Sequence, residues 1–400
     1  MKELGIPPYA GDRTGDKSLS KVVNRALLLD LLRKSGRSSR AALAKETGLT
    51  KVTVSSQVAD LLELGIVRET GAGASELGRK PVMLEVDGAA GFALGLSIST
   101  ESLRAVAMNA AGEVDRDEVL PMEGRSPEAV VAAVADAARR AKRRYGRSRF
   151  GLFGVGVALP GAVERGSGRV VRSAKLNWTD VPFQEAVARR YPGMLHVGND
   201  ATLATIAERR LHAPEADDFV CLLIDEGIGS GAFINGAIHY GYNGQFGEVG
   251  HMTIVHGGPR CPCGNLGCWD LYGSELALRQ ALGAARRGPP PGAEELLALA
   301  AAPPDWSREA FANFVGYLTT GVVSIVNSLA PSTMAINCDA LAASPALFDA
   351  LKAGVADRAM AHGGGCELRL SSLGKAAPAI GAAMAATERF FEGLVLQGSQ

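Results

Sequence analysis

Three cysteines and two histidines lie within residues 251–270, HMTIVHGGPRCPCGNLGCWD, of a 400-residue chain that has six cysteines in all. The spacing His251-x9-Cys261-x-Cys263-x4-Cys268 offers one imidazole and three thiols, a set suited to tetrahedral Zn²⁺. Soft thiolates clustered in a reducing compartment favour a metal over disulfides. Because four protein ligands leave no position for water, we predict one structural zinc ion per chain.

The fourth ligand has two candidates on spacing alone. His256 lies nearer the cysteines than His251 does, in a tight Gly-Gly turn. The other three cysteines, Cys221, Cys338 and Cys366, stand alone in apolar surroundings, and we expect them to be inert core thiols. The cluster is therefore the cysteine feature that carries chemistry.

Polar residues outside the cluster are weaker signals. Asn199 and Asp200 follow the apolar segment MLHVG where a strand gives way to a helix. That position favours functional carboxylates, and it favours helix capping at least as much. Glu248 and His251, three residues apart in GEVGH, are weak evidence when taken alone.

The chain around these residues alternates between apolar strands and helices from Gly91 onward, which predicts an α/β body with ligands near strand ends. Residues 286–306 are Pro-rich and predict a surface excursion. Four hundred residues exceed one hydrophobic core, so two or three domains are expected. The chain has no run of about 20 apolar residues and no signal-like N-terminus, so we expect a cytoplasmic protein without membrane contact.

The front of the chain has a different pattern. Residues 39–67 predict two short helices, with Gly48 ending the first and Thr50 capping the second. Val54, Val58, Leu61 and Leu62 recur at helical spacing and would pack inward. A cationic, hydroxyl-rich face then points outward, made of Lys51, Thr53, Ser55 and Ser56.

Two strands with a Gly-rich loop follow, with Arg79 and Lys80 at its tip, so the segment predicts a winged helix-turn-helix. From Lys17 to Val86 there are 12 Lys and Arg against 7 Asp and Glu, while the whole chain is neutral. A basic front section predicts an anionic partner, double-stranded operator DNA. We expect Thr50 and the outward face to contact base edges, Arg40 to contact phosphate, and Arg79 and Lys80 to enter the minor groove.

The chain resembles the ROK family (repressors, open reading frames, kinases). Its segment GEVGHMTIVHGGPRCPCGNLGCWDLYGS is similar to the family signature, and GND, GIGSGAFINGAIHYG and LGKAAPAIGAAMAATERFF agree with it. The resemblance is to regulators of the xylose, glucose and N-acetylglucosamine types. It implies an N-terminal winged helix-turn-helix followed by a two-lobed actin-like ATPase (ribonuclease H-like) domain.

The implied domains are a tail at 1–18, the winged helix at 19–86 and the ROK domain at 87–400. The first lobe would span about 87–210 with the helix 376–395, and the second 211–375 with the zinc loop 251–270. By the resemblance, His251 is the zinc ligand and the sugar contacts are Gly161, Asn199, Asp200, Glu248, His251 and Asp270. Asp200 matches the catalytic base of the family's kinases, and Asp270 replaces their usual Glu.

The resemblance fails where a family kinase binds nucleotide. The Asp-x-Gly-Gly-Thr loop is replaced by residues 97–101, Ser-Ile-Ser-Thr-Glu, and a second phosphate loop begins Asp225-Glu226. Two carboxylates there would repel a triphosphate. The adenosine-side glycines are replaced by Asn337 and Cys338, which Asp339 follows.

We therefore predict a non-catalytic, sugar-responsive transcriptional regulator, most simply a repressor of carbohydrate genes. Its partners would be operator DNA and a mono- or disaccharide or sugar-phosphate effector, and we expect a homodimer or homotetramer. An active ATP-dependent sugar kinase with an attached DNA-binding domain is the alternative. A zinc-responsive regulator is a third possibility, which a closed, permanently filled site disfavours.

Overall fold

A computed structural model describes residues 17–72, 81–360 and 365–397. The chain divides into two compact units. The first contains Ala158–Phe183 and Val197–Gly381, and the second contains Ile6–Val157, Gln184–His196 and Ala382–Gln400. This division does not follow the limits expected for the two lobes, and the domain limits given above stay a prediction.

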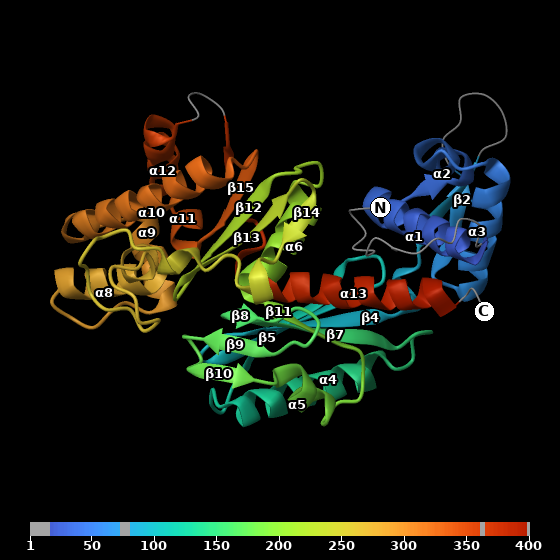
Figure 1. Cartoon of the computed structure of the whole chain (residues 1–400), viewed down its shortest axis with the longest axis horizontal. Coiled ribbons are helices and arrows are strands. Elements are labelled where there is room, and N and C mark those ends of the chain that lie inside the picture. Colours follow the sequence, from blue (N-terminus) through green and yellow to red (C-terminus); the bar gives the residue numbers. More distant parts are fainter. Residues whose placement is uncertain (1–16, 73–80, 361–364, 398–400) are drawn as a thin grey trace. The chain divides into compact units, whose positions relative to one another are not determined.

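The second unit begins with a winged helix (Figure 1). Its strands pair antiparallel in the order β1-β3-β2. The strands β2 and β3 are the two predicted strands of the wing, whereas Arg79 and Lys80 lie outside the described residues. The elements are α1 (Lys17–Ser35), β1 (Ser38–Ser39), α2 (Arg40–Thr47), α3 (Lys51–Leu64), β2 (Val67–Ala72) and β3 (Val82–Val86).

The local signals at the helix ends form as predicted. Gly48 ends α2 with a φ of 70°, a left-handed conformation that glycine adopts without a steric penalty. The hydroxyl of Thr50 caps α3 by accepting a hydrogen bond of 3.2 Å from the backbone N–H of Thr53. Val54, Val58 and Leu61 are fully buried, so the apolar stripe of α3 does pack inward.

The next sheet lies mostly in the second unit and has the order β11-β7-β4-β5-β6. Helix α4 (Pro127–Tyr145) packs against β4 and β5 through buried valines and alanines. The strands are β4 (Phe92–Ile98), β5 (Ser102–Asn109), β6 (Val114–Pro121), β7 (Leu152–Leu159) and β11 (Leu195–Asn199), and the short helix α5 spans Phe183–Ala188.

The first unit has a sheet of the same strand order, β14-β13-β12-β15-β16. In each sheet three strands that are successive in the chain pair antiparallel, β4-β5-β6 in one and β12-β13-β14 in the other. Two later strands are added next to the first of the three, β7 and β11 beside β4, and β15 and β16 beside β12. The strands here are β12 (Phe219–Ile224), β13 (Ile228–Ile234), β14 (Ala237–His239), β15 (Thr333–Asn337) and β16 (Glu367–Leu370).

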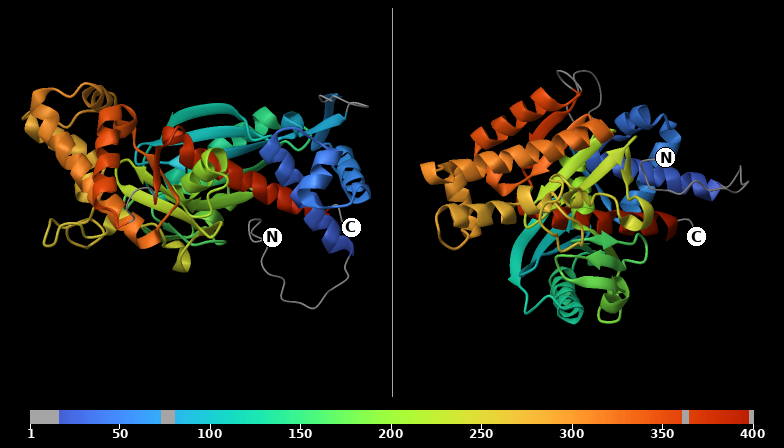
Figure 2. Two further views of the ribbon diagram at one scale, coloured as in Figure 1. Left: turned by 90° about the horizontal axis from the view of Figure 1, so that it is seen from above. Right: turned by 60° about the vertical axis from the view of Figure 1, so that its left-hand side comes forward.

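Helices cover both faces of this sheet (Figures 1 and 2). Val220, Leu222 and Ile224 of β12 belong to the core that includes α10, while Phe219 and Cys221 alternate to the face covered by α6. The helices are α6 (Asp200–His212), α7 (Asp270–Gly273), α8 (Glu275–Ala285), α9 (Ala293–Ala301), α10 (Arg308–Leu329), α11 (Asp339–Ala342), α12 (Pro345–Arg358) and α13 (Ala377–Gln397).

Two apolar segments differ from simple expectation. The Pro-rich stretch predicted as a surface excursion contains α9, whose Leu296 and Ala300 are buried in the core of the first unit. Residues Asp305–Leu329, which include α10, are long and apolar enough to cross a membrane by length and composition. Since Phe311, Phe314 and Leu318 of α10 fill that same core, this is the pattern of a core helix.

Helix α6 approaches α13 closely at one glycine. A Cβ atom at Gly381 would lie 1.8 Å from the backbone oxygen of Leu203, so no side chain fits there. The two helix backbones can touch only because position 381 is glycine. This contact holds α6 in place, and α6 begins at the functional site described next.

Candidate functional site

The strand-to-helix transition at Asn199 and Asp200 forms one wall of a pocket. Asn199 caps α6, since its Oδ1 atom accepts a hydrogen bond of 2.8 Å from the N–H of Thr202. Its Nδ2 atom donates to the backbone oxygen of Gly161 at 3.0 Å. The Oδ1 atom of Asp200 accepts from the N–H of Ala201 at 2.8 Å and leaves Oδ2 available to a ligand. These two residues can therefore cap the helix and bind a ligand at the same time.

Glu248, His251 and Asp270 form the opposite wall. The Nε2 atom of His251 lies 3.7 Å from the Oε2 atom of Glu248, and its Nδ1 atom lies 3.7 Å from the Oδ2 atom of Asp270. Asp270 is fixed because its Oδ1 atom accepts a hydrogen bond of 2.7 Å from the N–H of Ile228. A Cβ atom at Gly250 would lie 2.1 Å from Oδ1 of Asp270, so this glycine gives the carboxylate its room.

These residues enclose a pocket of about 380 Å³, within the range of small-molecule sites. All of its lining residues belong to the first unit. All six sugar-contact residues predicted from the resemblance line it, whereas sequence reasoning missed Arg172, Lys175 and Gln245. Arg172 lies on β9 and Lys175 in the turn after it, next to a small antiparallel sheet of β8 (Ala162–Val163), β9 (Val170–Ser173) and β10 (Trp178–Val181).

Burial shapes the charge of the pocket. Burial raises the pKa of Asp200 and of Asp270, and the positive charge of Lys175 opposes this rise. Burial, together with the nearby charge of Asp200, raises the pKa of Glu248 to about 7. These carboxyls can accept hydrogen bonds from hydroxyl groups, and when protonated they can also donate one.

The predicted metal ligands come together on the other side of His251. One ligand atom each from His251, Cys261, Cys263 and Cys268 lies within 4.8 Å of all the others. The Sγ atoms of Cys263 and Cys268 are 3.6 Å apart, and Nδ1 of His251 is 3.8 Å from Sγ of Cys261. Tetrahedral zinc with bonds of about 2.3 Å to sulfur requires such separations. The donor set fits this metal, and the structure places His251 in the cluster.

Asn265 ties the metal loop together. Its Nδ2 atom donates to the backbone oxygen of His251 and to Oγ1 of Thr253, both at 3.0 Å, and approaches Sγ of Cys268 at 3.4 Å. The N–H of Cys261 donates to the oxygen of Asn265 at 2.8 Å. The loop therefore positions His251 for the cluster and the pocket at once.

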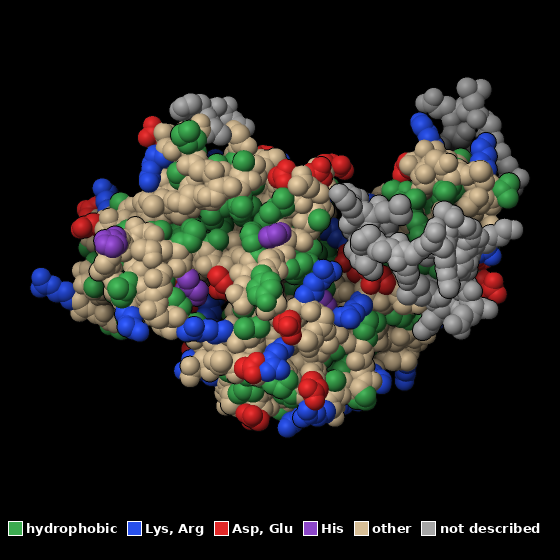
Figure 3. All heavy atoms as spheres, viewed as in Figure 1, with side chains coloured by type: hydrophobic (Ala, Val, Ile, Leu, Met, Phe, Trp, Pro, Cys, Tyr) green, Lys and Arg blue, Asp and Glu red, His purple; other side chains and the backbone are tan. Residues whose placement is uncertain are grey.

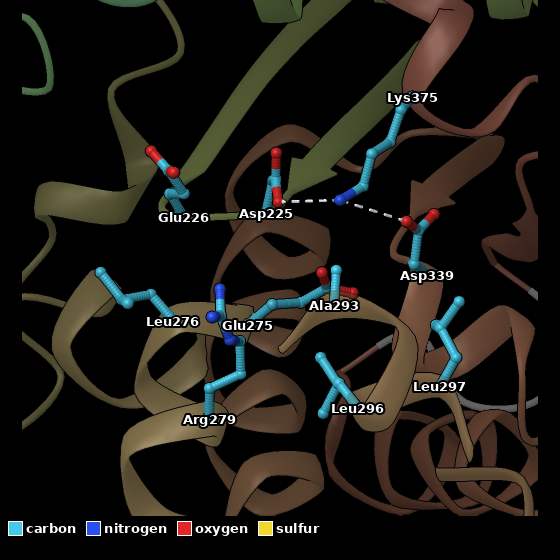
Figure 4. Close-up of a pocket in the computed structure, with 10 residues that line it drawn as sticks. All are labelled: Asp225, Glu226, Glu275, Leu276, Arg279, Ala293, Leu296, Leu297, Asp339 and Lys375. Atoms are coloured by element: carbon cyan, nitrogen blue, oxygen red, sulfur yellow. Dashed lines mark ion pairs between the residues drawn. The ribbon is translucent and has the colours of Figure 1, made fainter. Parts of the chain in front are cut away.

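A second, smaller pocket occupies the place of the altered phosphate and adenosine motifs (Figure 4). The Nζ atom of Lys375 lies 3.5 Å from Oδ1 of Asp225 and 3.4 Å from Oδ2 of Asp339. Burial opposes the charge of Lys375, yet these carboxylates raise its pKa. Asp225 is thus ion-paired with Lys375. The sequence alone predicts only that its carboxylate repels a triphosphate. The cavity is about 30 Å³, close to the volume of one water molecule.

The first altered phosphate loop is closed by its own hydrogen bonds. Residues 99–102 form the tight turn between β4 and β5, in which the N–H of Ser99 donates to the oxygen of Ser102 at 2.9 Å. The Oγ atom of Ser99 accepts from the N–H groups of Glu101 and Ser102. These amides are therefore not free to bind a phosphate, which needs backbone N–H groups that point outward.

The start of α3 presents a mixed face. Lys51, Ser55 and Ser56 are exposed, and Val52, which sequence reasoning missed, is 80% exposed. The hydroxyl groups of Thr50 and Thr53 are hydrogen-bonded to each other, with 2.9 Å between their oxygen atoms. Arg40 pairs with Glu69 at 2.9 Å and stays about one-third exposed. Lys and Arg side chains are visible on the winged helix in the space-filling view (Figure 3).

Comparison with known proteins agrees with this geometry. Residues 93–389 match the ROK family. The chain is 31% identical to the "Xylose repressor" of Bacillus subtilis (strain 168), over 94% of this chain and 98% of that protein. A crystal structure of a ROK family transcriptional regulator, described as a homolog of the E. coli MLC protein, covers 95% of this chain and 99% of its own at a TM-score of 0.79 and 22% identity. The crystal structure of a ROK family glucokinase from Streptomyces griseus, in complex with glucose and AMPPNP, covers 74% of this chain and 98% of its own. Its TM-score is 0.67 and its sequence identity is 20%.

Two α/β sheets of the same strand order, preceded in the chain by a winged helix, define a protein of the actin-like fold with an added N-terminal domain. The family match covers more than half of the chain, and the repressor relative covers nearly all of it. The chain belongs to the ROK family.

Proposed function

We propose that this protein is a sugar-responsive transcriptional repressor. One observation carries the proposal: the pocket lined by Asn199, Asp200, Glu248 and Asp270 measures about 380 Å³, whereas the cavity lined by Lys375 and its paired carboxylates measures only about 30 Å³. The relative named a xylose repressor, which is matched over nearly its whole length, supports the same function. In this role Asp200 accepts a hydrogen bond from a sugar hydroxyl and does not act as a catalytic base.

The DNA-binding role is assigned to the face at the start of α3. Lys51, Val52, Ser55 and Ser56 are exposed there, with Thr50 and Thr53 at the helix cap. An apolar side chain such as Val52 suits the methyl group of thymine, and the hydroxyls suit base edges. Arg40 could reach phosphate only by giving up its pair with Glu69. For Arg79 and Lys80 the minor-groove role stays a prediction from sequence.

The metal is proposed to be zinc, held by His251, Cys261, Cys263 and Cys268. When bound, it would supply structural cross-linking of the loop, since the four donors complete a tetrahedron. His251 would then be fixed through Nδ1, and its Nε2 atom would face Glu248 and the pocket. We further propose a homodimer or a larger even-numbered assembly, because two winged helices match a two-fold operator.

Repression would be controlled by a difference in sugar affinity between a DNA-binding state and a released state. A tenfold change in operator affinity needs about 1.4 kcal/mol of such difference. The test is a titration of sugars into the protein bound to an operator fragment, selected from random-sequence DNA and followed by fluorescence anisotropy. Release by one sugar supports the proposal. Lack of any response to a panel of mono- and disaccharides and their phosphates contradicts it.

The kinase alternative is separated by a second assay. A sugar kinase would transfer the terminal phosphoryl group of magnesium-bound ATP to a hydroxyl of its sugar and release ADP, and Asp200→Asn would abolish the turnover. We expect no turnover in the wild-type chain, because the N–H groups of Glu101 and Ser102 already donate to the Ser99 side chain and the cavity beside Lys375 is only about 30 Å³. Sugar-dependent turnover that requires Asp200 would establish the kinase.

A further inference from the structure

Both carboxyls and cations line the pocket. Asp200, Glu248 and Asp270 contribute the carboxyls, while Arg172 of β9 and Lys175 of the turn that follows contribute the cations. The hydroxyl groups of a neutral sugar can donate to carboxylates and accept from Lys or Arg, but they carry no negative charge to balance two cations. The two cations therefore favour a ligand that has a negatively charged group in addition to its hydroxyl groups.

Lys175 is positioned but not ion-paired. Its Cε atom would lie 3.0 Å from a Cβ atom at Gly227, so the absence of a side chain at 227 leaves room for the lysine stem. Among the described residues, no carboxylate oxygen lies within 4.0 Å of its ammonium group, in contrast to Lys375, which has two such partners. The lysine is half-buried, and its charge acts on Asp200, Glu248 and Asp270 from beyond contact distance.

Arg172 is anchored at one end only. Its Nη2 atom donates to the backbone oxygen of Cys263 at 3.0 Å, which fixes the guanidinium against the metal loop. Its Nε and Nη1 atoms have no hydrogen-bond acceptor in the part of the chain that the structure describes. Arg172 therefore offers unused donors from a fixed position, the arrangement that favours recognition of a carboxylate or a phosphate.

We infer that the effector is a sugar with one anionic substituent, bound between Lys175 and Arg172, while its hydroxyl groups face Asp200, Glu248 and Asp270. This inference rests on the proposed sugar-sensing function and names the ligand class of that site. Two sources share the required chemistry: a sugar acid, which carries a carboxylate, and a sugar phosphate.

A simpler role for Lys175 is to offset the three carboxylates. The two roles differ in what the lysine changes. An offsetting lysine affects the binding of neutral and anionic sugars alike, whereas a ligand-binding lysine affects their ratio. Selectivity, and not affinity alone, is thus the quantity to measure.

The experiment is isothermal titration calorimetry on the metal-loaded full chain with matched sets: an aldose, its uronic or aldonic acid, and its phosphate, for glucose, xylose and N-acetylglucosamine, with inorganic phosphate alone added. We expect one anionic member to bind at least tenfold more tightly than its neutral parent, and its identity assigns the source. Lys175→Met and Arg172→Met should bring this ratio close to one. Arg169→Met, which removes a cation paired with Asp180 outside the pocket lining, should leave it unchanged.

Two results would overturn the inference in different ways. If the neutral parent binds as tightly as its anionic forms, and Lys175→Met weakens all of them equally, the lysine only offsets charge and the sugar sensor stands. If no member of any set binds while the chain still binds DNA, the proposed sensing function fails and the inference fails with it. Binding of inorganic phosphate as tight as that of the sugar phosphates would also contradict it, because the sugar would then contribute nothing.

Discussion

The Nδ1 atom of His251 lies 3.8 Å from the Sγ atom of Cys261, so one imidazole belongs to the Cys₃His cluster and to the lining of the 380 Å³ pocket. Cys263 belongs to both as well. Through Arg172, which donates to the Cys263 carbonyl, the metal loop is also joined to the opposite rim. A change in the metal site should therefore reach the pocket.

Loss of a metal ligand is predicted to weaken sugar binding. Cys263→Ser should lower the zinc content below one per chain and weaken sugar affinity at least tenfold, because His251 and the Cys263 carbonyl lose their fixed positions. The measurements are elemental analysis and calorimetry. Cys366→Ser, a half-buried cysteine outside the cluster, serves as the control and should keep zinc and affinity. Zinc-free protein that binds sugar normally would contradict the prediction.

Removal of the Lys375 cation is predicted to destabilise the fold in a salt-dependent way. Lys375→Met leaves the carboxylates of Asp225 and Asp339 without their shared partner. Since the Lys375 side chain is about 45% exposed, the loss should be about 1 kcal/mol and should shrink in 1 M salt. Urea unfolding measures it. Lys352→Met, which breaks an exposed pair with Asp349, should cost less, and an equal loss in both variants would contradict a special role for Lys375.

Glu275 is predicted to make stability depend on pH. Burial raises its pKa from 4.5 to about 7, so between these values the folded chain holds a proton that the unfolded chain has lost. Stability from this group is therefore full below about pH 4.5 and falls as the pH rises to 7, by at most about 3 kcal/mol.

The variant Glu275→Gln stays uncharged and should lose this dependence. In urea unfolding at pH 5.5 and pH 8, the variant should gain stability relative to the wild type as the pH rises. Because the other titrating groups, including the metal ligands, are the same in both proteins, their effects on stability cancel in the difference between variant and wild type. Glu309→Gln on the exposed face of α10 is the control. Parallel curves for the wild type and Glu275→Gln would show that the carboxyl ionises freely in the folded state.

The start of α3 is predicted to separate two kinds of DNA contact. Lys51→Ala should weaken binding to all sequences and reduce the salt slope by about 1 if the lysine meets phosphate, or relax one base position if it meets a base edge. Val52→Ala should cost about 1–3 kcal/mol on the preferred operator and leave the salt slope unchanged.

Fluorescence anisotropy over a series of salt concentrations distinguishes these effects. Ala59→Ser, an exposed position further along the same helix, is the control and should have little effect. If Val52→Ala behaves like Ala59→Ser, Val52 does not contact the operator. Either result is independent of the sugar pocket, because both variants lie in the winged helix.

The sequence by itself determined the features that act over short distances along the chain. The caps at Gly48 and Thr50, the buried stripe of α3 and the three clustered cysteines depend on residues close together in the chain. Backbone geometry fixes such neighbours whatever the rest of the molecule does. For the same reason, Asn199 and Asp200 could be placed at a helix start from sequence, although their share in a pocket could not be settled.

Only the tertiary structure decided which charges meet. Asp225 and Lys375 are 150 positions apart, and Arg172 reaches the metal loop 91 residues away. Gln57 of α3 is buried, and its Oε1 atom has no hydrogen-bond partner among the described residues. Val52 was hidden because one exposed valine in a helix has no signature in sequence. Long-range charge pairing and exposure depend on how the strands bring distant segments together, and no local pattern contains that information.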